Sequence, residues 1–196
     1  SSLAAAGPGK EGQWVDETTP LSPLTFYGQS KKAGEEVALK YSASFPIKVI
    51  RPPVVYGPRE ENLYTFFKLI KKGWGLQIGR SPKKLSLLYV TDLVKAMIAV
   101  CDPRSSQKKI YFVTDGETYS WEEVAKIAAD KMNVSIKALK IPESILVPIA
   151  IFFEALAMFS AKPALFDRQR MIDVRQSCWT ASSENFFRDY GFTPQF

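Results

Sequence analysis

Histidine is missing from all 196 residues of the chain, and this absence excludes several kinds of chemistry. Ser-His-Asp and Cys-His catalysis need an imidazole base, and every metal site that contains histidine is excluded as well, so we expect no metal. The two cysteines, Cys101 and Cys178, form no spaced motif. We expect both to be buried, small apolar residues in a reducing, cytoplasmic setting.

The chain also has little that would direct it to a membrane or to a nucleic acid. Its first residues have neither the charged start and apolar run of a signal peptide nor an initiating methionine, so we expect the inside of a longer protein. The net charge of +6 is spread over short runs such as Lys71 and Lys72. Because no aromatic-rich basic strand accompanies this charge, we expect no nucleic-acid partner.

A glycine pattern near the start, G-x-G-x-x-G at Gly7, Gly9 and Gly12, is the type that can bind a dinucleotide pyrophosphate. Such a turn works only where a helix follows the glycines, because free N–H groups at the helix N-terminus hold the phosphate. The residues after Gly12 contain two prolines and no helical period for about ten residues. We therefore expect a flexible loop and no phosphate site.

Apolar periodicity and capping signals predict alternating strands and helices. A helix over 24–45 has a start signal at Ser22 and Pro23 and a stop at Pro46. Ser120 and Glu123 form a capping box for a helix over 121–132. The other expected helices are 63–73, 91–102 and 184–191, and the expected strands are 47–52, 85–90, 109–115 and 134–142. This alternation indicates an α/β fold with parallel strand pairing.

The most apolar segment, 141–161, has the length of a membrane span but contains two prolines and the carboxylates Glu143 and Glu154. A carboxylate in the middle of a bilayer is costly. We expect a buried or pocket-lining helix here, with contact to one face of a membrane as the alternative.

Three side chains together have the functional groups for acid–base chemistry. Tyr27 and Lys31 stand four residues apart in an expected helix, so both leave the same face one turn apart. A phenol is a weak acid at neutral pH, and a neighbouring ammonium group stabilises the phenolate. The hydroxyl of Ser2 could donate to the same substrate oxygen and stabilise charge that develops on it. The three would interconvert an alcohol and a ketone; the alternative is that Tyr27 and Lys31 are a surface pair.

Four stretches in order favour the catalytic interpretation: "SS" at 1–2, "YGQSK" at 27–31, "VIRPPVVYGPRE" at 49–60 and "LLYVTDLVKAM" at 87–97. With them the chain resembles the extended short-chain dehydrogenases/reductases, the NAD(P)-dependent epimerase/dehydratase family. Its ending, "CWTASSENFFRDYGFTP", is similar to that of the 3β-hydroxysteroid dehydrogenase and dihydroflavonol reductase-like branch. The resemblance implies that Tyr27 donates or accepts a proton, that Lys31 holds the nicotinamide ribose, and that Ser2 polarises the carbonyl. It also implies that Pro52, Pro53 and Val54 form the loop on the nicotinamide side.

The resemblance further implies a fold and a division of the chain. We expect the C-terminal part of a Rossmann-like doubly wound parallel sheet plus a small mixed α/β substrate-binding region. Residues 1–60 would belong to the Rossmann-like domain and carry the catalytic triad. Residues 61–196 would be mainly substrate-binding, with about 86–115 returning to the Rossmann-like core. Family members begin with a glycine-rich dinucleotide-binding half that precedes these motifs, so we expect this chain to hold NAD or NADP only in part and to be inactive as a fragment.

Substrate residues are expected from the same resemblance. Nucleotide-sugar epimerases of the family usually have an Asn after the R-P strand and an Arg before the V-x-D-L motif, where this chain has Val54 and Leu85. An apolar side chain cannot donate to a diphosphate, so the pattern favours a hydrophobic substrate. Arg59 and Arg80 are candidate replacements, and Tyr89 is a candidate pocket wall.

We therefore predict an NAD(P)-dependent oxidoreductase that interconverts a secondary alcohol and a ketone on an apolar small molecule. One alternative is a nucleotide-sugar epimerase or dehydratase, and another is a non-catalytic family member that senses a cofactor or binds a partner. A small-molecule substrate is the expected partner, and a homodimer is left open. Asp92 is expected to be structural, because an acid at the start of a helix is favoured by the helix dipole.

Overall fold

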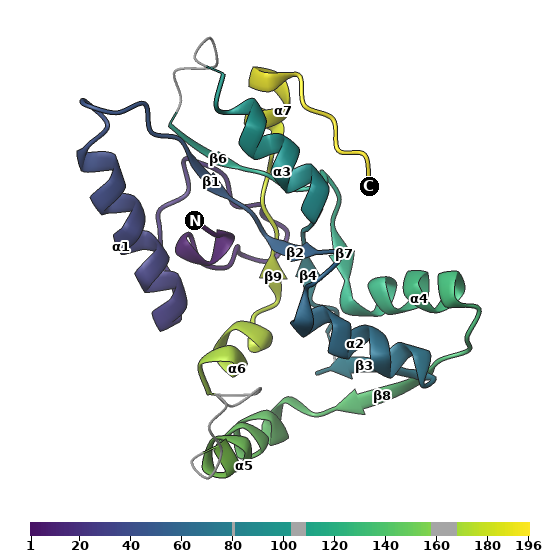
Figure 1. Ribbon diagram of the computed structural model, residues 1–196. Helices are drawn as coiled ribbons and strands as arrows, with labels where there is room; N and C mark the ends of the chain where they lie inside the picture. Colours follow the sequence, from purple (N-terminus) through teal and green to yellow (C-terminus); the bar gives the residue numbers. More distant parts are fainter. Residues whose placement is uncertain (80, 103–108, 158–167) are drawn as a thin grey trace. The chain divides into compact units, whose positions relative to one another are not determined.

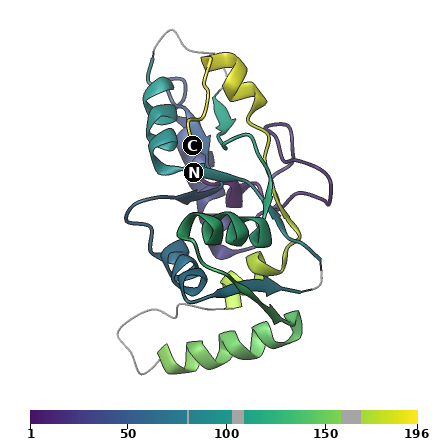
Figure 2. The same ribbon diagram turned by 90° about the vertical axis from the view of Figure 1, so that its right-hand side faces the viewer.

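The computed structural model of the chain describes residues 1–79, 81–102, 109–157 and 168–196. The chain forms two compact units and crosses between them repeatedly. Unit 1 comprises Ser1–Glu61, Lys84–Tyr119 and Cys178–Phe196, and unit 2 comprises Asn62–Lys83 and Ser120–Ser177. Figures 1 and 2 show the elements of both units.

Unit 1 contains parallel strand pairs with helices beside them. Its elements are η1 (Leu3–Ala5), α1 (Phe26–Lys40), β1 (Val49–Arg51), β2 (Val54–Tyr56), β4 (Lys84–Leu85), β5 (Leu87–Tyr89), α3 (Val90–Ala99), β6 (Ile110–Phe112), β9 (Cys178–Trp179) and α7 (Glu184–Tyr190). Strand β1 pairs with β6, β2 with β5, and β4 with β9, each in parallel. The expected α/β class and parallel pairing are therefore confirmed.

Strand β6 separates two apolar clusters because successive side chains of a strand point to opposite faces. Tyr111 packs with residues of β5, α3 and α7 in the cluster Leu88, Ala96, Tyr111, Val113 and Phe186. Phe112 packs with η1 in the cluster Leu3, Ala6, Val15, Phe112 and Ala181. The segment that carries Ser2 is thus built into the interior of unit 1.

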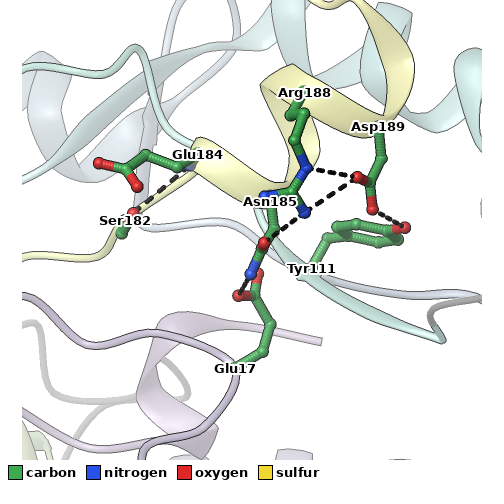
Figure 3. A network of polar contacts seen from close by, with 7 residues as sticks. All are labelled: Glu17, Tyr111, Ser182, Glu184, Asn185, Arg188 and Asp189. Carbon is green, nitrogen blue, oxygen red and sulfur yellow. Dashed lines mark hydrogen bonds and ion pairs between the residues drawn. The ribbon is translucent and has the colours of Figure 1, made fainter.

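Polar contacts attach α7 to the rest of unit 1 (Figure 3). The Tyr111 hydroxyl donates to Asp189 over 3.0 Å, and the Asn185 amide donates to Glu17 over 2.6 Å. Arg188 donates to Asn185 over 2.7 Å and pairs with Asp189. These bonds connect α7 to β6 and to the loop that carries Glu17. The C-terminal helix is therefore held to the N-terminal segment within unit 1.

Unit 2 is built around one further parallel pair. Its elements are α2 (Glu61–Lys71, whose first residue belongs to unit 1), β3 (Trp74–Ile78), α4 (Trp121–Met132), β8 (Lys137–Ile141), η2 (Glu143–Ile145), α5 (Leu146–Ala157) and α6 (Arg168–Arg175), with the short β7 (Tyr119–Ser120) at the border. Strand β3 pairs with β8 in parallel. Ile70 of α2 is buried against Ala125 and Ala129 of α4. The capping box of α4 is confirmed, since the Glu123 N–H donates to Ser120 and the Ser120 N–H donates to Glu123.

Helix α1 is shorter than the expected 24–45 at both ends. Its N-cap is Thr25, whose hydroxyl accepts from the Gly28 N–H over 3.3 Å, and not Ser22 or Pro23. It ends at Lys40, and turns fill the residues before Pro46. A hydroxyl one residue before the helix satisfies a free N–H directly, so it defines the start better than a proline upstream does.

Several elements were not expected from the sequence. Strand β2 follows two prolines, β3 contains a glycine, β7 and β9 have two residues each, and α6 is rich in arginine. Strand β2 forms because β5 supplies its hydrogen bonds, and β3 forms because β8 does. Local propensity cannot show such pairing, which depends on residues distant in the chain.

Two expectations about burial are wrong. Cys178 is buried, but Cys101 is exposed at the end of α3, and both are free thiols. Within the apolar segment 141–161, residues 146–157 form the helix α5, in which Ile151 and Phe152 are 50% and 60% exposed; residues 158–161 lie outside the described residues. Among the residues that the structure describes, no helix is long and apolar enough to cross a bilayer.

Candidate active site

Helix α1 places the side chains of Tyr27 and Lys31 beside each other. The Lys31 ammonium nitrogen lies 5.3 Å from the centre of the Tyr27 ring, as the four-residue spacing predicts. The Tyr27 side chain is exposed, with 54% of its surface open to solvent, so a small molecule can reach its hydroxyl. An aromatic ring attracts a cation held over its face at this distance.

Ser2 is the N-cap of the short helix η1. Its hydroxyl oxygen accepts from the Ala4 N–H over 3.2 Å, which leaves the hydroxyl hydrogen available to donate to another group. The next residue, Leu3, donates its N–H to the Pro52 carbonyl over 2.8 Å. The serine turn is therefore attached to the loop that follows β1.

Gly28 allows α1 to approach the serine turn closely. A β carbon at residue 28 would lie 2.4 Å from the carbonyl oxygen of Ala4 and 3.0 Å from Cβ of Pro23. A backbone oxygen cannot move away as a flexible side chain can. The contact therefore requires glycine at the position directly after Tyr27, and it holds the turn of α1 that carries Tyr27 against the turn that carries Ser2.

We predict that Gly28→Ala in the full-length protein lowers turnover about 100-fold, because a shift of about 1 Å between catalytic groups has an effect of this size. The melting temperature should also fall. Gly34→Ala is the matched control: it lies in the same helix, and its β carbon would meet nothing within 4 Å. That change should stabilise the helix by about 0.5–1 kcal/mol and leave turnover unchanged. Equal behaviour of the two variants in steady-state kinetics would contradict the proposed close contact.

A buried ion pair attaches the same helix to β1. The two nitrogens Nε and Nη2 of Arg51 donate to the two carboxylate oxygens of Glu35 over 2.9 and 2.6 Å, and both side chains are less than 5% exposed. The Ser1 hydroxyl donates to the same carboxylate. Burial alone would raise the pKa of Glu35, but the hydrogen bonds from Arg51 and Ser1 outweigh it, so this pKa is lowered. One carboxylate thus connects α1, β1 and the residue before Ser2.

Glu35 and Arg51 were missed by the sequence analysis. Glu35 follows Lys31 by four residues and therefore lies on the same side of α1, and Arg51 lies in an apolar strand where an unpaired charge would be costly. These two signals could have identified the pair.

The loop after β1 carries the residues expected on the nicotinamide side. Pro52 and Pro53 separate β1 from β2, and Val54 begins β2, where it pairs with Leu87 of β5. All three are partly buried. Because Pro52 accepts the hydrogen bond from Leu3, this loop lies next to the serine turn.

Tyr89 lies among aromatic rings at the end of β5. Its ring centre is 5.2 Å from that of Tyr56, its pairing partner, and 4.6 Å from that of Phe196. Burial, with the nearby charge of Asp115, raises the pKa of Tyr56. Burial also raises the pKa of Asp115 itself, which accepts a hydrogen bond from Tyr119. Tyr56 therefore remains a neutral phenol near neutral pH.

The remaining expected substrate residues are more dispersed. Arg59 is exposed in the loop after β2, with a left-handed φ of 74° that is uncommon for a residue other than glycine. Leu85 is 2% exposed and lies in β4, where it pairs with Trp179 of β9. Arg80 lies outside the described residues.

The glycine pattern near the start of the chain and Asp92 were the other two motifs considered in the sequence. The segment with Gly7, Gly9 and Gly12 is irregular, and the residues after it form turns and a single bridge at Val15 rather than a helix. Asp92 is fully buried in the first turn of α3 and accepts from the N–H groups of Gln195 and Phe196. It therefore holds the C-terminal segment in place.

These features define a parallel α/β protein with a Tyr-x-x-x-Lys helix packed on a serine turn. The chain matches the RmlD substrate binding domain over residues 7–149. It belongs to this family and, with it, to the NAD(P)-dependent epimerases and dehydratases of the extended short-chain dehydrogenase/reductase type.

Known proteins similar to the chain include enzymes of two kinds. A ceramide reductase of Caulobacter vibrioides is 23% identical over 162 residues, which are 82% of this chain and 50% of that protein. A UDP-glucose 4-epimerase of Vibrio cholerae is 32% identical over 117 residues, which are 56% of this chain and 36% of that protein. The crystal structure of a Thermus thermophilus UDP-glucose 4-epimerase in complex with NAD has the same fold, with a TM-score of 0.71, 21% identity and coverage of 100% of this chain and 57% of that one. The chain thus spans half or less of the curated relatives it matches.

Proposed function

We propose that the chain is the catalytic part of an NAD(P)-dependent enzyme of the epimerase/dehydratase type that acts on a sugar linked to a nucleotide. The observation that carries the proposal is the pair of Tyr27 and Lys31 on one face of α1. The Lys31 ammonium nitrogen lies 5.3 Å from the centre of the Tyr27 ring, and this part of the helix packs against the turn that bears Ser2. A phenol, an ammonium group and a hydroxyl are the groups needed to move a proton to or from a carbinol oxygen.

In this proposal Tyr27 accepts the proton of the substrate hydroxyl while the carbon that bears it is oxidised to a ketone. The Lys31 ammonium group lies beside the Tyr27 ring, and Ser2 donates a hydrogen bond to the substrate oxygen. The nicotinamide, when bound, supplies or accepts the hydride at that carbon. An epimerisation would be complete once the ketone had turned its opposite face to the hydride donor and Tyr27 had returned the proton to the oxygen.

The residues present fit a nicotinamide ribose. Lys31 would hold the ribose, and the Pro52–Val54 loop, attached to the serine turn, would lie on the nicotinamide side. Solved structures with this fold hold NAD or NADPH.

The preference for a nucleotide sugar is supported by the relatives, among which the enzyme from Vibrio cholerae acts on UDP-glucose by name. Arg59 is the candidate ligand of the diphosphate, because a guanidinium binds phosphate oxygens in pairs and this one is exposed. The proposal therefore favours a nucleotide sugar, whereas Val54 and Leu85 alone had favoured a hydrophobic substrate.

A second candidate is a reductase of an apolar ketone. It is favoured by Val54 and Leu85, which cannot donate to a diphosphate, and by the relative named as a ceramide reductase, which matches 82% of this chain. In this case Tyr27 would give its proton to the ketone oxygen.

The two candidates predict different ligands for the full-length protein. A nucleotide-sugar enzyme binds UDP or dTDP in calorimetry and converts UDP-glucose, and Arg59→Ala weakens that binding about tenfold. Arg188→Ala is the control, because Arg188 is an exposed arginine held on α7. Absence of any nucleotide diphosphate binding, together with NADPH oxidation in the presence of a long-chain ketone, would overturn the first candidate in favour of the second.

A further inference from the structure

The first two turns of helix α5, residues 146–153, are apolar on the outer side as well as on the inner side. On the inner side, Leu146 and Ala150 pack against Met171 of α6. Among the side chains that the structure describes here, the exposed apolar ones of η2 and α5 are Ile145, Val147, Ile151, Phe152 and Phe153. A helix at the surface of a water-soluble protein ordinarily places polar residues outward, and helices that are apolar all round lie in a protein core or in lipid. The outer face of α5 is therefore suited to a medium other than water.

The strand before this helix extends the apolar face and adds positive charge. Strand β8 leads into η2 and α5, as Figure 1 shows, and its last residue, Ile141, joins the cluster beneath α5. Leu139 is 43% exposed, and Lys137 and Lys140 are exposed on the same strand. Side chains two residues apart in a strand share a face. Lys137 and Leu139 therefore lie on the same face of β8 as Ile141, which packs against α5.

The net positive charge of the chain comes entirely from unit 2, which contains α5. Unit 2 has 13 basic and 7 acidic residues, a net charge of +6, whereas unit 1 has 13 of each and is neutral. Two of the basic residues, Arg168 and Arg170, are exposed on α6, which packs against α5. An exposed apolar helix beside excess lysine and arginine is complementary to a surface of lipid with anionic headgroups.

We propose that α5 docks unit 2 on an anionic lipid bilayer, with the helix lying in the plane of the membrane surface. A helix of 12 residues is about 18 Å long, which is shorter than the hydrocarbon core of about 30 Å, so it can lie in the interface but cannot span the bilayer. Phe152 and Ile151 enter the acyl region, and Lys137, on the same face of β8 as Leu139, contacts the headgroups. This association is independent of the substrate that the active site takes.

Co-sedimentation of the full-length protein with vesicles tests the proposal. We expect binding to vesicles of 70% phosphatidylcholine and 30% phosphatidylglycerol, weaker binding to pure phosphatidylcholine, and a decrease in binding as salt is raised. Phe152→Asp should reduce the bound fraction about tenfold. Phe45→Asp is the matched control: Phe45 is 61% exposed in the neutral unit 1, so the same change there should leave binding unchanged.

A second variant, Lys137→Gln, removes charge from an exposed strand position and keeps a polar side chain there. It should weaken binding to the anionic vesicles only. The proposal is overturned if the wild-type protein stays in the supernatant with anionic vesicles or if Phe152→Asp binds as well as the wild type. It is also overturned if light scattering shows a dimer that Phe152→Asp converts to a monomer without any lipid, since a second copy would then cover this face.

Discussion

If the proposed function is right, replacing Tyr27 by phenylalanine should lower the turnover of the full-length protein about 10²- to 10⁴-fold while its affinity for NAD(P) changes less than about twofold. The change removes one hydroxyl from an exposed side chain and keeps the ring near which Lys31 lies. If the hydroxyl moves the substrate proton, the chemical step slows and cofactor binding does not change. Steady-state kinetics and a fluorescence titration of NADH on the same preparation separate the two quantities.

Tyr41→Phe provides the control for this experiment. Tyr41 is 58% exposed at the other end of α1, so the same hydroxyl is removed from a similar environment away from Lys31. Near-normal turnover of the Tyr27 variant, or an equal loss in both variants, would contradict the role assigned to Tyr27.

The second large effect is expected at the buried ion pair. Arg51→Leu leaves the Glu35 carboxylate buried without its partner, and this should lower the free energy of unfolding by about 3–5 kcal/mol at pH 7. Urea denaturation of the full-length protein measures the loss. The double variant Glu35→Leu with Arg51→Leu should recover much of it, because removing both charges also removes the cost of burying them. A double variant less stable than either single variant would contradict this explanation.

The same pair gives stability a defined pH dependence. The pKa of Glu35 is lower in the folded protein than in the unfolded chain. Its contribution is therefore complete above the unfolded value of about 4.3, and it is lost as the pH falls through the lowered folded value. Comparison of the wild type with Glu35→Gln in urea should show a difference in stability that is constant near neutral pH and shrinks as the solution becomes more acidic than about pH 4. A difference that grows on acidification would contradict the assigned direction.

Parts of the structure that depend on neighbouring residues could be predicted from the sequence. The capping box of Ser120 and Glu123 is a signal within four consecutive residues, and it forms as expected. The adjacency of Tyr27 and Lys31 follows from helix geometry alone. The relation of Ser2 to that pair is different, since it depends on residues 25 positions away and was inferred only from the order of motifs shared with a family.

Parts that depend on distant residues could not be predicted in this way. Strand β2 lies between prolines and forms because β5 pairs with it. The role of Gly28 depends on the Ala4 carbonyl, which local sequence does not place nearby. The exposure of Phe152 was missed because a helix without a polar face has no periodicity to indicate which side faces outward.

The most direct test of the central claim is a fluorescence titration of NADH and NADPH into the full-length protein and two lysine variants. We predict saturable binding of one of the two nucleotides by the wild type, at least tenfold weaker binding by Lys31→Met, and unchanged binding by Lys32→Met, which alters the adjacent, equally half-buried lysine. Binding of neither nucleotide by the wild type, or an equal effect of the two lysine variants, would contradict the claim that this helix serves an NAD(P)-dependent active site.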